Sequence, residues 1–221
     1  MNTPQPASEL RDVTELALPY FVSLPRNPTG RGVVVAHEGL GITTQILRFS
    51  ERLAGEGYVV VAPDFFYRTG GPRDEDWWTS INAITDDELR DDLRSAIAAL
   101  HDRGAVSIGL TGFCLGGRIS YRGAKWAEDL GVDAVVSFYG DYAPELGPLH
   151  CPALLLFGGK DEYISADSVA AVKAFHGDLV HVYPDNGHAF MRDGDPSFEP
   201  NAAGDAWARL LSFFAQHLAP G

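Results

Sequence analysis

The sequence is poor in cysteine and in basic residues, and both shortages narrow what the protein can be. Only two of its 221 residues are cysteine, Cys114 and Cys151, so a disulfide framework is excluded. Lys and Arg number 17 against 30 Asp and Glu, which gives a formal net charge of −13. Because no basic patch is present, we expect neither nucleic acid nor an anionic membrane as a partner, and the same charge repels anionic substrates at long range.

Long hydrophobic runs and a targeting segment are also lacking. No apolar run approaches the length that spans a membrane, and the first seven residues have neither the basic nor the apolar region of a signal peptide. We therefore expect a cytoplasmic protein, in which a free cysteine stays reduced. The chain length and the 45% hydrophobic content favour one globular domain over residues 1–221, with a loosely held tail at 1–14. A monomer and a small homo-oligomer both remain open.

Apolar runs alternate with segments of helical periodicity along the chain. Several runs are continuously hydrophobic, as strands buried on both faces are. This alternation predicts an α/β fold with a mainly parallel central sheet and helices on both faces. The expected strands are 17–24, 33–36, 58–62, 106–110, 132–138, 153–157 and 179–183, and the expected helices lie at about 44–54, 86–100, 119–127, 165–175 and 201–218.

Two local signals add detail to this pattern. Turn residues at 26–30 predict that the first strand forms a hairpin with the next one. Asp86 or Asp87 is the expected N-cap of the second helix.

The irregular segment 65–85 is rich in aromatic residues, including Trp77, so we expect it to form the rim of a pocket. The alternative is an ordinary connector with a packed aromatic cluster.

The centre of the pattern is a strand, a sharp turn and a helix around Cys114. The turn reads Gly112-Phe113-Cys114-Leu115-Gly116. This is the arrangement of a nucleophile elbow with cysteine in place of serine. The nucleophile takes a strained backbone position, and the residues two positions away must be small because strand and helix approach closely. The helix N-terminus also favours a thiolate. The alternative from this stretch alone is a buried structural cysteine, which is also the expected role of the second cysteine.

A cysteine nucleophile needs a base, and the base needs an acceptor that orients it. Asp161 comes after two glycines at a strand end, and His188 follows the last expected strand in a Gly-flanked loop. The chain order of nucleophile, acid and base is that of the α/β-hydrolase fold, so we predict a triad of Cys114, Asp161 and His188. Glu162 is the alternative acid, and His37 is a weaker candidate for the site.

Two backbone N–H groups are expected to form an oxyanion hole. One belongs to Leu115, directly after the nucleophile, and the other to the loop 37–41 after an earlier strand, where Gly39 is the best candidate. The same loop carries Glu38, a carboxylate that could accept the thiol proton. The alternative for Glu38 is a solvated side chain on a loop.

At these residues the sequence resembles the dienelactone hydrolase family, from about residue 14 to the end. The resemblance implies the triad named above, and it implies that Glu38 contacts the resting thiol and takes part in its activation. It also implies that Arg192 pairs with a substrate carboxylate, for which a guanidinium is well suited. The matching segments are 38–41, 63–64 with the aromatic stretch that follows, 112–117, 138–140, 159–161, and 187–190 followed by Arg192.

Further substrate contacts are expected from Tyr139, Trp77 and Phe190. The family's second pocket arginine comes from the aromatic segment, where Arg68 and Arg73 are both present and neither matches securely.

For Arg192 the alternative role is a surface ion pair with Asp193 or Asp195.

The expected activity is the hydrolysis of a small lactone or ester, carboxylate-bearing as in a dienelactone, through a thioester on Cys114. No metal site and no cofactor are expected, because no ligand cluster is visible. Two other activities remain open: a general carboxylesterase that acts on small neutral esters, and a redox role for the cysteine. A hydrolase-fold protein that binds without catalysis is the alternative from a different class.

Overall fold

The computed structural model describes residues 18–71, 79 and 83–221. Its centre is a seven-stranded sheet with the order β1-β3-β2-β4-β5-β6-β7, in which β1 is antiparallel to β3 and all other neighbours are parallel. This confirms the predicted α/β fold. The strands are β1 (Tyr20–Ser23), β2 (Arg31–Ala36), β3 (Val59–Pro63), β4 (Ser107–Phe113), β5 (Ala134–Phe138), β6 (Ala153–Gly158) and β7 (Val180–Tyr183).

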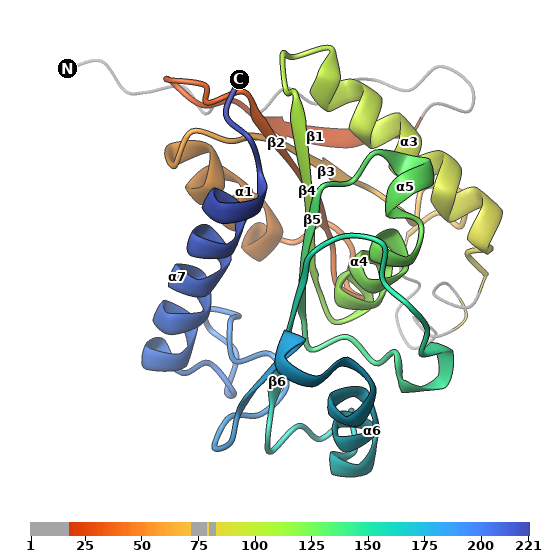
Figure 1. The fold of residues 1–221 in the computed structure, drawn as a ribbon, viewed down its shortest axis with the longest axis vertical. Helices are drawn as coiled ribbons and strands as arrows, with labels where there is room; N and C mark the ends of the chain where they lie inside the picture. The colour runs from red at the N-terminus through yellow and green to blue at the C-terminus, as the bar shows by residue number, and fades with distance from the viewer. Residues whose placement is uncertain (1–17, 72–78, 80–82) are drawn as a thin grey trace.

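Helices cover both faces of the sheet (Figure 1). α1 and α7 lie on one side, and α3, α4 and α5 lie on the other, with α6 beside the β7 end. Within the described ranges, no helix combines the length and the apolar character needed to cross a membrane. The helices are α1 (Thr44–Gly55), α3 (Asp86–His101), α4 (Leu115–Lys125), α5 (Ala127–Leu130), α6 (Ala166–His176) and α7 (Pro200–His217), with 3-10 turns at Ala143–Glu145 and Gly177–Leu179.

The predicted hairpin between the first two strands is wrong. β1 pairs with β3, so that Tyr20 lies opposite Pro63, while β2 lies between β3 and β4. The turn at 26–30 does reverse the chain, but it passes the start of β3, where the Thr29 N–H donates to the carbonyl of Gly57 at 3.0 Å. Both edges of β2 are therefore occupied by parallel partners, which is consistent with its continuous apolar run.

The predicted N-cap of α3, Asp86 or Asp87, is also wrong, by one or two residues. Thr85 is the cap: its side chain accepts from the backbone N–H of Glu88, and the Glu88 carboxylate accepts from the N–H of Thr85 at 3.0 Å. This reciprocal pair is a capping box, so Asp86 and Asp87 are free to place their charges in the first turn.

The carboxyl ends of the parallel strands meet at one edge of the sheet. The loop 37–41 follows β2, Cys114 follows β4, residues 159–162 follow β6 and residues 184–188 follow β7. In an open parallel sheet this edge is where ligands bind, so the fold gathers the predicted site residues at the expected place.

Candidate active site

Cys114 occupies the sharp turn between β4 and α4. Its φ of 53° is a strained value for a residue with a side chain, and among the described residues only one other non-glycine, Tyr139, has a positive φ. The turn is possible because small residues surround it. A Cβ atom on Gly116 would collide with the carbonyl of Ala36, and one on Gly112 would collide with the Gly116 backbone. Strand β2, strand β4 and helix α4 therefore meet around the thiol.

His188 is held by Asp161 across the site. Its Nδ1 lies 2.7 Å from Asp161 Oδ2, and the other carboxylate oxygen accepts from the N–H groups of Tyr163 (2.8 Å) and Ile164 (2.9 Å). The alternative acid, Glu162, instead accepts from the backbone N–H of His188 at 3.3 Å. The structure therefore brings Asp161, and not its neighbour, to the imidazole ring.

The remaining ring nitrogen of His188 is available to the thiol. Nε2 is buried and has no completed hydrogen bond to any described residue. Burial alone would lower the pKa of His188, but the hydrogen bond to Asp161 and the interaction with Cys114 raise it to about 10. Cys114 therefore lies within electrostatic reach of the ring, while no hydrogen bond joins the two side chains, as is common before substrate binds.

The two residues predicted to form the oxyanion hole come from elements that pack against each other. Leu115 is the first residue of α4, and N–H groups in the first turn of a helix have no intrahelical acceptor. Gly39 lies in the loop 37–41, which follows β2 and packs against α4, as the close approach of Ala36 and His37 to Gly116 shows. The loop is closed by the Gly41 N–H, which donates to the Glu38 carbonyl at 3.0 Å.

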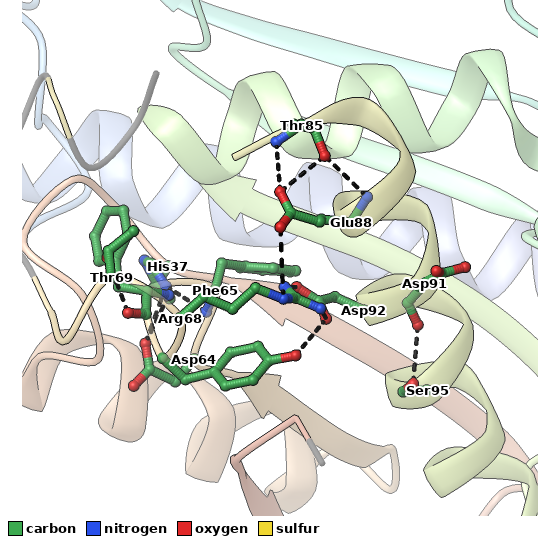
Figure 2. A network of polar contacts seen from close by, with 12 residues as sticks. His37, Asp64, Phe65, Arg68, Thr69, Thr85, Glu88, Asp91, Asp92 and Ser95 are labelled. Carbon is green, nitrogen blue, oxygen red and sulfur yellow. Dashed lines mark hydrogen bonds and ion pairs between the residues drawn. The ribbon is translucent and has the colours of Figure 1, made fainter. Parts of the chain in front are cut away.

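His37 fixes this loop and is fully buried. The Phe65 N–H donates to its Nε2 at 3.0 Å, so the ring proton is on Nδ1, which lies 2.7 Å from the carbonyl of Glu38. Burial lowers the pKa of His37 and keeps the ring neutral, although the bond to Glu38 and the nearby Asp64 act in the opposite direction. Figure 2 shows the contacts of the ring with Phe65 and Asp64. His37 is therefore a structural connector beneath the site.

Glu38 is buried, so its alternative role as a solvated side chain is wrong. The Thr43 hydroxyl donates to its carboxylate at 3.3 Å, and Arg192 Nε lies 3.6 Å from the same oxygen. Burial raises the pKa of Glu38, and the charge of Arg192 opposes this rise. Arg192 also lies 3.9 Å from Asp195, whereas Asp193 faces Arg48 on the surface.

Arg68 is engaged away from the thiol. Its guanidinium binds Asp92 of α3 through two hydrogen bonds of 2.6 and 2.8 Å, and Tyr67 donates to the same carboxylate (Figure 2). A bidentate pair with a buried carboxylate leaves little of the guanidinium for a substrate. Of the predicted second arginines, Arg73 lies outside the described residues, as do Trp77 and the rest of 72–78 and 80–82.

Tyr139 and Phe190 are fully buried, and the substrate contacts expected of them stay predictions. The Tyr139 ring lies 4.8 Å from that of His188, and the Phe190 ring lies 5.4 Å from Tyr139, so both support the imidazole from the core side. On the solvent side, Tyr163 is 64% exposed and its ring is 4.9 Å from His188. Tyr163 was not among the predicted site residues, although an aromatic residue two positions after the predicted acid was a usable signal.

No group of three His, Cys, Asp or Glu side chains in the described part of the chain could hold a metal ion.

A model of the dienelactone hydrolase family matches residues 18–218. A Yersinia pestis protein with the provisional name carboxymethylenebutenolidase is 31% identical over 229 residues, covering 90% of this chain and 84% of that protein. A protein of Escherichia coli strain K12 with the same provisional name is 32% identical over 226 residues, covering 90% and 83%. The crystal structure of a provisionally named dienelactone hydrolase from Klebsiella pneumoniae superposes with a TM-score of 0.80 at 28% identity, covering 90% of this chain and 93% of that one.

Proposed function

This chain belongs to the dienelactone hydrolase family, and we propose that it is a carboxylic ester hydrolase that cleaves a small lactone or ester through a thioester on Cys114. The observation that carries the proposal is the 2.7 Å bond between Asp161 and His188, with the free ring nitrogen buried beside a cysteine at a strained turn. This is the relation of nucleophile, base and orienting acid that acyl transfer requires.

Acylation begins with the Cys114 sulfur as a thiolate and His188 as an imidazolium. The thiolate attacks the carbonyl carbon, and the developing oxyanion is held by the N–H groups of Leu115 and Gly39. When the tetrahedral intermediate collapses, the bond to the leaving oxygen breaks and that oxygen takes the proton from His188 Nε2. The raised pKa of His188 supports the protonated starting state.

Deacylation uses the imidazole that acylation has left neutral. His188 accepts a proton from water, the hydroxide attacks the thioester, and the thiolate leaves with the carboxylic acid released. Asp161 holds Nδ1 protonated throughout, so that Nε2 always faces the reacting atoms. A thiolate is itself a good leaving group, and therefore activated esters and enol-lactones are the preferred substrates.

A carboxylate on the substrate is the finer part of the proposal. Arg192 is the cation beside Glu38, and a carboxylate bound there would displace Glu38 and leave it able to take the thiol proton. This role for Glu38 is proposed from the family resemblance and is supported by its burial and by its loose 3.6 Å contact with Arg192.

The second candidate is a carboxylesterase that acts on neutral esters. It is favoured by a specific observation: Arg192 already has two carboxylates, Glu38 and Asp195, within 4 Å. Arg192→Ala separates the two candidates. If the natural substrate is anionic, the variant loses kcat/KM on an anionic ester and keeps it on the neutral ester of the same leaving group; equal losses on both would remove the carboxylate assignment.

Substitution of each cysteine in turn tests the nucleophile. We expect Cys114→Ala to lose at least about 1000-fold in kcat on nitrophenyl esters, since the covalent route is removed. Cys151→Ala is the matched control, because burial raises the pKa of the Cys151 thiol to about 12 and keeps it unreactive at neutral pH. Ester hydrolysis by Cys114→Ala at the wild-type rate would refute the proposal.

A further inference from the structure

Arg192 is held much less firmly than Arg68, the arginine that binds Asp92. Arg68 makes bonds of 2.6 and 2.8 Å to Asp92, whose side chain is 2% exposed. Arg192 has instead two long ion pairs, 3.6 Å to Glu38 and 3.9 Å to Asp195. Contacts of this length do not satisfy the guanidinium donors, so Arg192 can turn to bind an arriving carboxylate in a bidentate manner.

Asp195 cannot leave as the substrate arrives, because its position is fixed by the loop. Its Oδ1 accepts from the Ser197 N–H at 2.9 Å, its own N–H donates to the carbonyl of Arg192 at 3.1 Å, and its carbonyl accepts from the Phe198 N–H at 3.0 Å. The other carboxylate oxygen is the one that faces Arg192. A negative charge is thus held beside the guanidinium whether or not a substrate is bound.

The charge of Asp195 reaches into the buried part of the site. Burial is the main reason why the pKa of Glu38 is raised, and Asp195 raises it further. The pKa of Tyr139 is raised as well, chiefly by burial, then by the charges of Glu38 and Cys114, and also by Asp195. Because Asp195 is only 22% exposed, solvent screens these interactions incompletely.

We propose that Asp195 is a specificity-determining residue, which competes with a substrate carboxylate for Arg192 and so lowers the preference of the enzyme for carboxylate-bearing esters over neutral ones. The proposal rests on the ester hydrolase activity proposed above. It adds that the opposite charges of Arg192 and Asp195 together determine whether anionic or neutral esters are preferred. Arg192 attracts the carboxylate, and Asp195, 3.9 Å from Nη1 of the same guanidinium, repels it.

The test uses Asp195→Asn and two nitrophenyl esters, one of acetic acid and one that is the half ester of succinic acid. The Asn side-chain carbonyl can still accept from Ser197, so the loop is kept while the charge is lost. We expect the ratio of kcat/KM for the anionic ester to that for the neutral one to rise about three- to tenfold, chiefly through a lower KM for the anionic ester.

Asp193→Asn is the matched control. It removes one negative charge two residues away, but Asp193 is 67% exposed and its neighbour is Arg48, 3.7 Å away on the surface. We expect its ratio to stay at the wild-type value. An equal rise in both variants would mean that only the net charge of the protein matters, and an unchanged ratio in Asp195→Asn would overturn the assignment.

Isothermal titration calorimetry with succinate measures how Asp195 affects the binding of a carboxylate to Arg192 when no ester is hydrolysed. We expect Asp195→Asn to bind succinate about three- to tenfold more tightly than the wild type, and Arg192→Ala in the Asp195→Asn background to abolish the gain. Unchanged succinate binding would refute the role of Asp195 even if the protein hydrolyses esters. Conversely, tighter binding without any ester hydrolysis would support the role of Asp195 and refute the proposed function.

Discussion

Among the described residues, Asp92 is the most deeply buried carboxylate that pairs with an arginine, and its partner Arg68 joins the start of the aromatic segment to α3 (Figure 2). Removing the arginine would leave a carboxylate in a poorly solvated position. We expect Arg68→Met to lower the free energy of unfolding by about 2–4 kcal/mol, less than a fully buried pair would lose because Arg68 itself is partly exposed.

Urea denaturation measures this effect, with Arg94→Met as the control. Arg94 lies on the same helix and has pairs of 2.9 and 2.7 Å with Asp91 and Asp129, but all three side chains are largely exposed. We expect this control to lose less than about 1 kcal/mol. Similar losses in the two variants would show that burial of Asp92 adds nothing to the pair.

His37 should make stability depend on pH. Burial lowers the pKa of His37 below its ordinary value of 6.5, so below that pH the unfolded chain binds a proton that the folded protein resists. The contribution is fully present above pH 6.5 and is lost as the pH falls toward the folded pKa, by up to about 1.4 kcal/mol for each pH unit.

The measurement is urea denaturation of wild type and His37→Gln at several pH values between 7 and 5. The variant starts less stable, but we expect it to lose less stability over this range than the wild type. His150→Gln, a change at a partly exposed histidine far from the loop, should keep the wild-type slope. Parallel slopes for wild type and His37→Gln would contradict the neutral, buried state of His37.

At the residue scale, the acid and the base of the candidate triad could be predicted from their order along the chain. The ion-pair partners of individual side chains could not. The acid and base loops follow strand ends in the order of the fold, so Asp161 and His188 could be selected from many carboxylates and seven histidines. The engagement of Arg68 with Asp92, however, depends on where α3 packs, and no spacing in the sequence encodes that. The same is true of the position of Asp195 beside Arg192.

Helix α4 is the element that fixes the elbow, and its glycines are there for packing. A Cβ atom on Gly116 would collide with the backbone of β2, while one on Gly204 in α7 would meet nothing within 4 Å. We expect Gly116→Ala to lose at least about 2 kcal/mol of stability, because backbone must move to admit the methyl group. Gly204→Ala should gain up to about 1 kcal/mol, since alanine is the better helix former.

Thermal unfolding of the two alanine variants tests whether Gly116→Ala lowers the stability and Gly204→Ala raises it. The pair is matched in residue change and in secondary structure, so intrinsic helix propensity is the same in each and only the surroundings differ. A stabilising Gly116→Ala would mean that the strand and the helix do not approach as closely as the structure places them.

At the element scale, the positions of the strands along the chain were predicted well. Which strands pair with each other in the sheet was predicted less well. Continuous apolar runs identify β2 and β3 as buried strands, but a run of this kind does not say which strand lies on either edge. For this reason the first strand was wrongly predicted to pair with β2 instead of β3. The capping box of α3 was available in the sequence as Thr85 and Glu88, and it was missed because two aspartates follow the threonine.

The whole molecule brings distant segments to one edge of the sheet. Glu38 follows β2 and Arg192 follows β7, yet the two side chains meet because all of the parallel strands end on the same side. The site is therefore a property of the topology, and a sequence that specifies the strand order also specifies which loops meet. With a net charge of −13, the molecule as a whole repels an anionic ester, so a local cation is needed to hold one.

The central claim is that Cys114 carries the acyl group during turnover. The most direct test is rapid acid quenching of the enzyme with a nitrophenyl ester, followed by mass spectrometry of the intact protein and of its peptides. We predict one acyl group on the peptide that contains Cys114, retained in Cys151→Ala and absent in Cys114→Ala. An acyl group on any other residue, or undiminished turnover by Cys114→Ala, would contradict the account.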